Sequence, residues 1–273
     1  MNEVSLEAIE QSGYRRAGFA EHYDAYRPAP PAVLLDTLTR YVAGPPLDRV
    51  VDLGSGTGLS TRAWADRAGD VIGVEANPAM RVVAEARTAE PNVRYVEAFA
   101  AETGLPAASA DLVTCSQSFH WMAREPVLAE AARILRPAGV FAAYDYDTPP
   151  AVHPDVHKAF ADHLRLRRHF RDVHEVAAGW TRAPKTEHLA AIRESGHFAF
   201  VRELVLHDEG DAGVEEVLGL ARSLGLVPEL RALGVTDEEL GLTRLEETAR
   251  RVLGRRTLPW LIGYRVRLGV RAA

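Results

Sequence analysis

The sequence has little of several residue types that mark other classes of protein. Its single cysteine, Cys115, excludes an intramolecular disulfide and a cysteine-based metal site, and we expect it to be a small buried residue. No apolar run comes near the ~18 residues that a membrane span requires. The first residues are acidic and polar, whereas a signal peptide is basic and then apolar. These absences predict a cytoplasmic protein without a membrane partner.

Positive charge is also scarce. The chain has 32 Lys and Arg against 38 Asp and Glu, which gives a net charge of -6 and a pI near 5.9. Such a chain is not attracted as a whole to nucleic acid or to anionic lipid. The charge balance therefore favours a small-molecule partner and argues against nucleic acid.

The 273 residues, 47 % of them apolar, are enough for one large globular domain with a sizeable core. Short β-branched runs alternate with amphipathic stretches, which is typical of a doubly wound α/β sheet. We expect strands at residues 49–53, 70–75, 93–97, 111–115, 140–145, 198–207 and 257–270. Helices are expected at 33–42, after Asn77-Pro78, from about 125 to the stop at Arg136-Pro137, at 153–178 and 188–194, and twice within 212–253.

These patterns divide the chain into four parts. Residues 1–46 form an N-terminal cap segment, which we place over the carboxyl edge of the sheet, and residues 47–147 form the ligand-binding core. Residues 148–185 are a helical insertion that adds to the cap, and residues 186–273 complete the α/β core.

A glycine-rich turn follows the first expected strand. In RVVDLGSGTGLST, Asp52 ends the strand and Gly54, Gly56 and Gly58 let a ligand lie against the backbone before the next helix begins. A dinucleotide site requires G-x-G-x-x-G, and Leu59 breaks that pattern. Glu75 ends the next strand, where a carboxylate can accept hydrogen bonds from both hydroxyls of a ribose. An adenosine-type ligand is therefore expected, with NAD disfavoured.

These residues resemble the class I S-adenosylmethionine-dependent methyltransferases, in particular the small-molecule group whose first motif reads D-L-G-x-G-x-G, as residues 52–58 do. The resemblance continues through TGLPAASADLVTCSQSFHWM and ARILRPAGVFAAYD, and AEHYDAYRPAPP is similar to the Y-x-x-x-R-P-x-x-P segment of trans-aconitate methyltransferases. It implies a Rossmann-like seven-stranded sheet with an antiparallel last strand, and S-adenosylmethionine as the cofactor.

The resemblance also implies roles for individual residues. The three glycines would lie under the methionine part, and Ser55 is also implied in cofactor binding. Asp52 would organise the loop and the cofactor's amino group, and Glu75 would hold the ribose. Tyr23 and Arg27 lie four residues apart, and Arg27 is either a partner of the cofactor carboxylate or a helix cap. The other residues implied in cofactor binding are Ala76, Met80, Ala100, Ala101, Ser116 and Gln117.

Methyl transfer from a sulfonium depends mainly on holding two reactants in line, so a side-chain base is optional. His120 follows the fourth strand at the mouth of the expected site, where it is either a general base or a polar residue of the rim. Trp121, Tyr144 and Asp145 are expected near the acceptor. Catalysis is thus assigned to His120 alone.

The insertion carries five histidines and a run of arginines. His153 and His157 have a metal-ligand spacing, but no carboxylate completes a site, so no metal is expected. Arg165, Arg167, Arg168 and Arg171 either attract an anionic acceptor or form the solvated face of a helix.

The function predicted from sequence is methyl transfer from S-adenosylmethionine to a small molecule by in-line displacement. The alternatives are another reaction of the sulfonium such as cyclisation, a non-catalytic module that binds the same cofactor, and an NAD-dependent oxidoreductase. A nucleobase acceptor is disfavoured because SQSFHW stands after the fourth strand, where methyltransferases of nucleobase amino groups have N/D-P-P-Y. An α/β-hydrolase is disfavoured because the serine of Gly54-Ser55-Gly56 is out of phase with the motif G-x-S-x-G. The oligomeric state and the methylated atom stay open.

Overall fold

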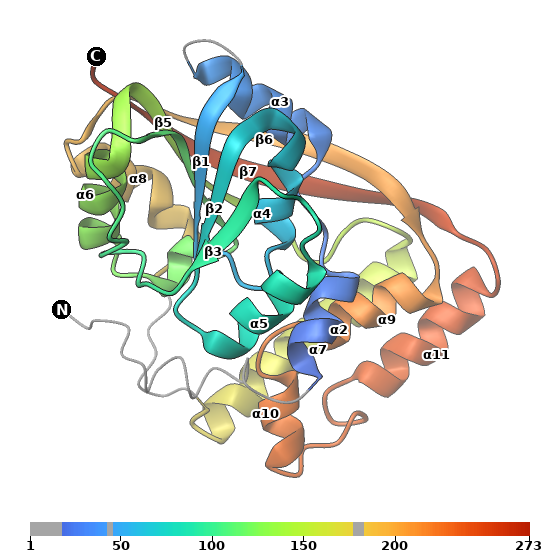
Figure 1. Ribbon diagram of the computed structural model, residues 1–273. Helices are drawn as coiled ribbons and strands as arrows, with labels where there is room; N and C mark the ends of the chain where they lie inside the picture. Colours follow the sequence, from blue (N-terminus) through green and yellow to red (C-terminus); the bar gives the residue numbers. More distant parts are fainter. Residues whose placement is uncertain (1–17, 43–45, 177–182) are drawn as a thin grey trace.

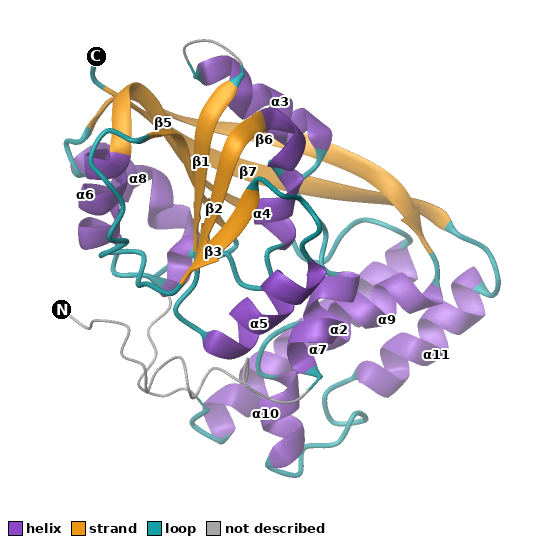
Figure 2. Cartoon of the chain, viewed as in Figure 1, coloured by secondary structure: helices purple, strands orange, loops and turns teal. Residues whose placement is uncertain are grey.

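Seven strands form one twisted sheet in the order β3-β2-β1-β4-β5-β7-β6. All neighbours pair in parallel except β7, which runs antiparallel to both β5 and β6 (Figures 1 and 2). The computed structural model describes residues 18–42, 46–176 and 183–273. The strands are β1 Leu47–Leu53, β2 Ala68–Val74, β3 Val93–Val96, β4 Ala110–Ser116, β5 Leu135–Tyr146, β6 Phe198–Ala212 and β7 Leu258–Arg271. The predicted fold class is therefore confirmed.

Helices cover both faces of the sheet and gather at one end of it (Figure 2). They are α2 Phe19–Tyr26, α3 Ala32–Tyr41, α4 Leu59–Ala63, α5 Pro78–Arg87, α6 Arg124–Ile134, α7 Pro154–Val173, α8 His188–Glu194, α9 Val214–Arg222, α10 Val227–Ala232 and α11 Leu242–Leu253. Short 3-10 turns lie at η1 Ala65–Arg67, η2 Phe119–Trp121 and η3 Lys185–Glu187. None of these described helices is both long enough and apolar enough to cross a bilayer.

Alternate residues of each central strand enter opposite cores because successive strand side chains point to opposite faces. On β1, Val50 belongs to the core under α3, α7 and α9, whereas Val51 belongs to the core under α6 and α8. Both side chains are fully buried. Burial on both faces explains why these strands read as continuous apolar runs in the sequence. Cys115 is buried in the second core, as expected, and burial raises its pKa well above the ordinary value.

The region between β6 and β7 differs from expectation. Two helices are predicted within residues 212–253, and three are found. Leu226 adopts a positive φ of 79° and separates α9 from α10. The turn at Thr236, whose backbone N–H and hydroxyl both donate to Glu239, separates α10 from α11. The predicted helix over 153–178 is α7, which ends at Val173, and residues 177–178 lie outside the described part.

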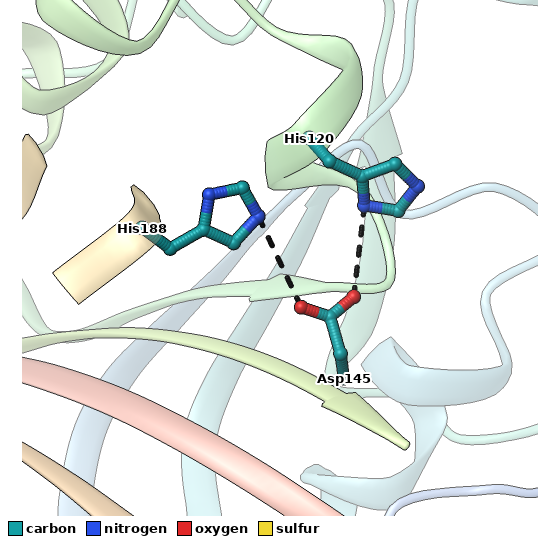
Figure 3. A group of neighbouring side chains, drawn as sticks. All are labelled: His120, Asp145 and His188. Carbon is teal, nitrogen blue, oxygen red and sulfur yellow. Dashed lines mark ion pairs between the residues drawn. The ribbon is translucent and has the colours of Figure 1, made fainter. Parts of the chain in front are cut away.

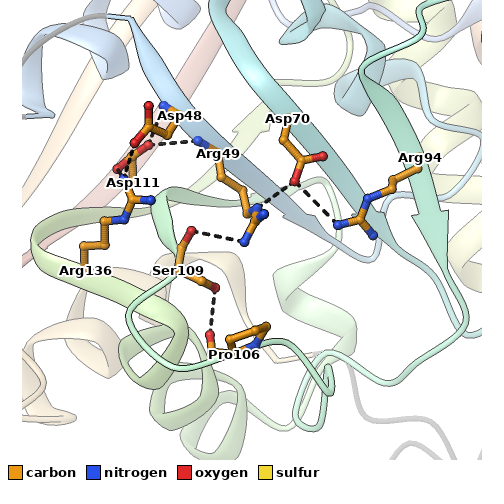
Figure 4. A network of polar contacts seen from close by, with 8 residues as sticks. All are labelled: Asp48, Arg49, Asp70, Arg94, Pro106, Ser109, Asp111 and Arg136. Carbon is orange, nitrogen blue, oxygen red and sulfur yellow. Dashed lines mark hydrogen bonds and ion pairs between the residues drawn. The ribbon is translucent and has the colours of Figure 1, made fainter.

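An ion-pair network ties together the amino ends of β1, β2, β3 and β4 (Figure 4). Asp111 accepts hydrogen bonds from the backbone N–H groups of Asp48 and Arg49 at 2.6 and 2.9 Å, and from Arg136 at 2.7 Å. Arg49 and Arg94 both reach Asp70. In an open α/β sheet ligands bind at the carboxyl ends of the strands, so this network lies at the opposite edge and is structural.

Candidate active site

The turn between β1 and α4 has the open backbone that the sequence predicts. Gly54, Gly56 and Gly58 have φ values of 68°, 57° and 78°, which L-residues with a side chain rarely adopt. A Cβ on Gly54 would lie 2.8 Å from Cβ of Ser118, so packing as well as backbone conformation favours glycine here. A Cβ on Gly56 would meet only Cε of Met80, at 3.6 Å. Gly56 is therefore the position where the backbone itself borders open space.

Asp52 organises this turn from below. Its fully buried carboxylate accepts hydrogen bonds from the hydroxyls of Thr61 and Thr114, both at 2.8 Å. Burial raises the pKa of Asp52 from 3.8 to about 6 against the opposing effect of these hydrogen bonds. The carboxylate thus connects α4 to β4.

Glu75 follows β2 and faces the glycine turn. Its two carboxylate oxygens accept hydrogen bonds from the backbone N–H groups of Gly56 and Asn77, each at 2.8 Å. Asn77 caps α5 by accepting from Ala79 and Met80. Burial raises the pKa of Glu75 above its ordinary value.

These elements line a first cavity of about 190 Å³ at the carboxyl ends of β1, β2 and β4. Of the residues predicted to bind cofactor, eleven line it: Tyr23, Arg27, Gly54, Ser55, Gly56, Glu75, Ala76, Met80, Ala100, Ser116 and Gln117. Three predicted residues do not. Asp52 is covered by its threonine partners, Gly58 packs against Tyr95, and Ala101 lies one residue past the lining residue Ala100.

A second cavity of about 230 Å³ adjoins the first. Tyr23, Arg27, Gln117 and Trp121 line both cavities and so form the boundary between them. The rest of its described wall comes from η2, the loop after β5, α7, η3 and the loop after α9. These residues are His120, Thr148, Leu164, Arg167, Arg168, Lys185, Leu224 and Gly225. Two chambers that meet at a shared wall can hold two reactants in contact.

Comparison with known proteins identifies the fold and a family that matches part of the chain. Residues 51–143 match the family described as "Methyltransferase domain". The chain is 36 % identical over 118 residues to an uncharacterised methyltransferase-like protein of Schizosaccharomyces pombe, and 29 % identical over 150 residues to the probable S-adenosylmethionine-dependent methyltransferase CRG1 of Saccharomyces cerevisiae. Over these residues the chain is similar to S-adenosylmethionine-dependent methyltransferases.

The alignments cover 43 % and 53 % of this chain and 45 % and 51 % of the two relatives, so the chain spans about half the length of the curated relatives it matches. Among solved structures, a putative type II methyltransferase from Anaeromyxobacter dehalogenans has a TM-score of 0.61 at 24 % identity, covering 90 % of this chain and 98 % of that chain. The YcgJ protein of Bacillus subtilis has a TM-score of 0.53 at 20 % identity, covering 88 % and 98 %. These likenesses establish the fold. The resemblance to trans-aconitate methyltransferases stays a prediction.

S-adenosylmethionine is the cofactor of this methyltransferase family, and the polar atoms of the first cavity suit it. Among the described residues, the buried side-chain atoms Oγ of Ser55 and Nε2 of Gln117 have no hydrogen-bond partner. Gln117 also holds a positive φ of 54°, a strained conformation that is common at binding sites. Buried polar atoms are normally paired. Both residues line the cavity, so a polar ligand there would satisfy them.

Arg27 lies on the boundary between the two cavities. Its guanidinium carbon lies 4.5 Å from the centre of the Tyr23 ring. It donates to the hydroxyl of Tyr146 and, at 3.0 Å, to the carbonyl of Ser223. These contacts attach the end of α2 to β5 and to the end of α9, as a structural residue would, while the side chain still lines both cavities.

His120 is buried on η2 and belongs to a cluster with Asp145 and His188 (Figure 3). Its Nδ1 lies 3.6 Å from one carboxylate oxygen of Asp145, and Nε2 of His188 lies 4.0 Å from the other. Although burial opposes it, contact with His120 and the charge of Lys185 hold the pKa of Asp145 below its ordinary value. Burial lowers the pKa of His188 to about 4, which keeps this imidazole neutral.

Each member of this cluster offers one metal-ligand atom, all within 4.8 Å of one another. Two cations already face the carboxylate, however. Nζ of Lys185 lies 2.7 Å and Nη1 of Arg267 3.2 Å from the oxygens of Asp145. A metal ion would add positive charge beside them, so the cluster is best described as an ion-pair network that orients His120. On α7, His153 is occupied as the N-cap, accepting from the backbone N–H of Asp155.

Two residues expected near the acceptor, Tyr144 and Asp145, line neither cavity. Tyr144 is buried, and its hydroxyl lies 2.6 Å from Oγ of Ser60 beneath the glycine turn. Asp145 faces the histidine cluster and lines neither cavity. Trp121 and His120 do line the second cavity.

Several lining residues were not singled out from sequence. Pro28 and Pro30 belong to the quoted R-P-x-x-P segment, and that motif was a usable signal. Ser118 and Met122 follow β4 in the quoted SQSFHWM segment. Lys185 carries no local motif, and only the packing of η3 brings it to the site.

Proposed function

We propose that the protein transfers the methyl group of S-adenosylmethionine to a small-molecule acceptor by in-line displacement. The observation that carries this proposal is the pair of adjoining cavities, one bordered by the glycine turn and Glu75 and the other by the cap. When bound, the cofactor supplies an electrophilic methyl group on a sulfonium. Aligning two reactants is worth up to ~7 to 11 kcal/mol in favourable cases, and a shared wall provides that alignment.

In this proposal the first cavity holds the cofactor. Gly54 and Gly56 lie under its methionine part, and Glu75 accepts from the ribose hydroxyls in place of the backbone N–H groups it now binds. Met80 and the backbone at Ala100 border the adenine. Gln117, on the boundary, holds the end that faces the acceptor.

The second cavity holds the acceptor. Trp121 forms a wall at the boundary, and His120 lines the cavity while the carboxylate of Asp145 lies 3.6 Å from its Nδ1. An imidazole oriented in this way can accept a proton at Nε2 from a hydroxyl or amine acceptor. For an acceptor that is already ionised, the same imidazole serves as a polar contact.

A thermal melt tests the cofactor assignment without knowledge of the acceptor. At 100 times its dissociation constant a ligand adds about 2.7 kcal/mol, which for a chain of this size raises Tm by several degrees. We expect stabilisation by S-adenosylmethionine and S-adenosylhomocysteine and none by NAD. A shift with NAD alone would overturn the proposal. Release of S-adenosylhomocysteine together with a methylated product then separates an enzyme from a non-catalytic binding module.

A further inference from the structure

The second cavity differs in charge from the chain as a whole. The protein has a net charge of -6. Among the described residues that line this cavity, four carry a positive charge and none is an Asp or Glu. The four are Arg27, Arg167, Arg168 and Lys185. They come from the end of α2, from α7 and from η3, so three separate segments bring positive charge to one place.

The arginine run of α7 divides into two pairs. Arg165 lies 3.7 Å from Asp162, and Arg171 lies 2.6 Å from Asp172, so these two arginines have carboxylate partners on their own helix. Neither lines the cavity, whereas Arg167 and Arg168 both do. The run is therefore part solvated helix face and part cavity wall.

The cavity-facing cations have defined surroundings. Arg167 donates to the carbonyl of Gly225 at 2.7 Å, which holds its guanidinium against the wall through a neutral acceptor. Arg168 is exposed, and no described residue accepts a hydrogen bond from it. Nζ of Lys185 lies 2.7 Å from the carboxylate of Asp145 and 3.1 Å from Oε1 of Gln117. Its charge therefore acts both on the cavity and on the cluster of His120, Asp145 and His188. That carboxylate is further balanced by Arg267.

We propose that the second cavity binds the acceptor as an anion, a small molecule carrying an ionised carboxylate or phosphate that is held by Arg167, Arg168 and Lys185. This inference rests on the proposed function and names its substrate class. Guanidinium groups form charge-assisted, often bidentate hydrogen bonds with both kinds of anion. Gln117 and Trp121 belong to both cavities, so an anion held at the far wall keeps the rest of the molecule directed toward the cofactor.

The test measures binding of defined acids to the protein saturated with S-adenosylhomocysteine. The probes are succinate, citrate and glycerol 3-phosphate, each paired with a neutral counterpart: succinamide, citramide or glycerol. We expect at least one acid to raise Tm and its neutral counterpart to have no effect, with the shift falling as NaCl rises from 50 to 500 mM. A response to succinate or citrate alone identifies a carboxylate site, and a response to glycerol 3-phosphate alone identifies a phosphate site.

Two variants of α7 make the test specific. Arg168→Gln removes a cavity-lining charge and should weaken acid binding about tenfold, which corresponds to about 1.4 kcal/mol. Arg165→Gln removes a charge from the same helix outside the cavity and should leave acid binding unchanged. Melting without acid checks that both variants fold.

The outcomes separate this inference from the proposal beneath it. Failure of the wild type to bind S-adenosylhomocysteine refutes the proposed function. If S-adenosylhomocysteine binds normally, three results refute the anion site alone: no acid binds, the neutral counterparts stabilise the protein equally, or the two variants bind acid alike.

Discussion

Adding a single methyl group at position 56 tests whether the glycine turn contacts the ligand. A matched glycine elsewhere controls for the backbone strain that the methyl group also causes. Gly56 has a φ of 57°, and a Cβ there meets only Met80 Cε at 3.6 Å. Gly196 has a φ of 71° and nothing within 4 Å of an added Cβ, and it lies beyond α8, lining neither cavity. Gly56→Ala and Gly196→Ala therefore introduce similar strain in different places.

Both variants should lose a similar amount of stability. A side chain in the left-handed region costs roughly 1–2 kcal/mol, and the reduced entropy of the unfolded chain returns about 0.4–1 kcal/mol. The net loss of about 1 kcal/mol lowers Tm by roughly 2–4 °C in a chain of this size. Only Gly56→Ala places its methyl at the wall of the first cavity, where overpacking costs about 1–3 kcal/mol, equivalent to roughly 5- to 150-fold in affinity.

Isothermal titration with S-adenosylhomocysteine measures that difference directly. We expect weaker binding by Gly56→Ala and wild-type binding by Gly196→Ala, at comparable melting temperatures. Wild-type affinity in Gly56→Ala would show that the ligand does not lie against the glycine turn, and the assignment of the first cavity would fail.

Two further predictions concern buried polar groups. The native state holds the Asp52 proton to a higher pH than the unfolded chain does, because the pKa rises from 3.8 to about 6. Wild type should therefore lose about 3 kcal/mol of unfolding free energy relative to Asp52→Asn as the pH rises from about 3, below both pKa values, to about 7, above both. Urea denaturation across this range measures the loss, and parallel pH profiles of the two proteins would contradict the prediction. His120→Ala should lower turnover at least tenfold while leaving affinity for S-adenosylhomocysteine unchanged. His157→Ala, at an exposed position on α7, should change neither turnover nor affinity. Full activity of His120→Ala would reduce His120 to a residue of the rim.

The parts of the site that sequence predicts well are those set by local geometry. A buried strand that ends in a glycine turn must deliver that turn to the carboxyl edge of the sheet, so Gly54 and Gly56 could be placed without coordinates. The same holds for Glu75, which follows the neighbouring strand. The order of strands and helices was predictable because two-sided burial leaves runs of apolar residues between polar turns.

What sequence could not settle is how far each strand extends and what packs against it. The fifth strand was expected to end at 145, and topology placed Tyr144 near the acceptor, but β5 continues to Tyr146. Residues two apart point to the same face of a strand, so Tyr146 reaches the first cavity while Tyr144 remains in the core below it. Asp145 points to the opposite face and meets His120 and His188. Helix α8 contributes His188 through packing that no local pattern reports.

The ion pair between Lys185 and Asp145 has a practical consequence because lysine is so rare in this chain. Lys158, exposed on α7, is the other lysine of the whole sequence. An amine-directed acylating reagent thus has two side-chain targets, and one of them lines the second cavity with 40 % of its side chain exposed. Mass spectrometry of the acylated chain gives a ratio between the two sites in which Lys158 is the internal standard. Occupancy of the cavity then becomes readable as protection of one residue, without any knowledge of the reaction catalysed.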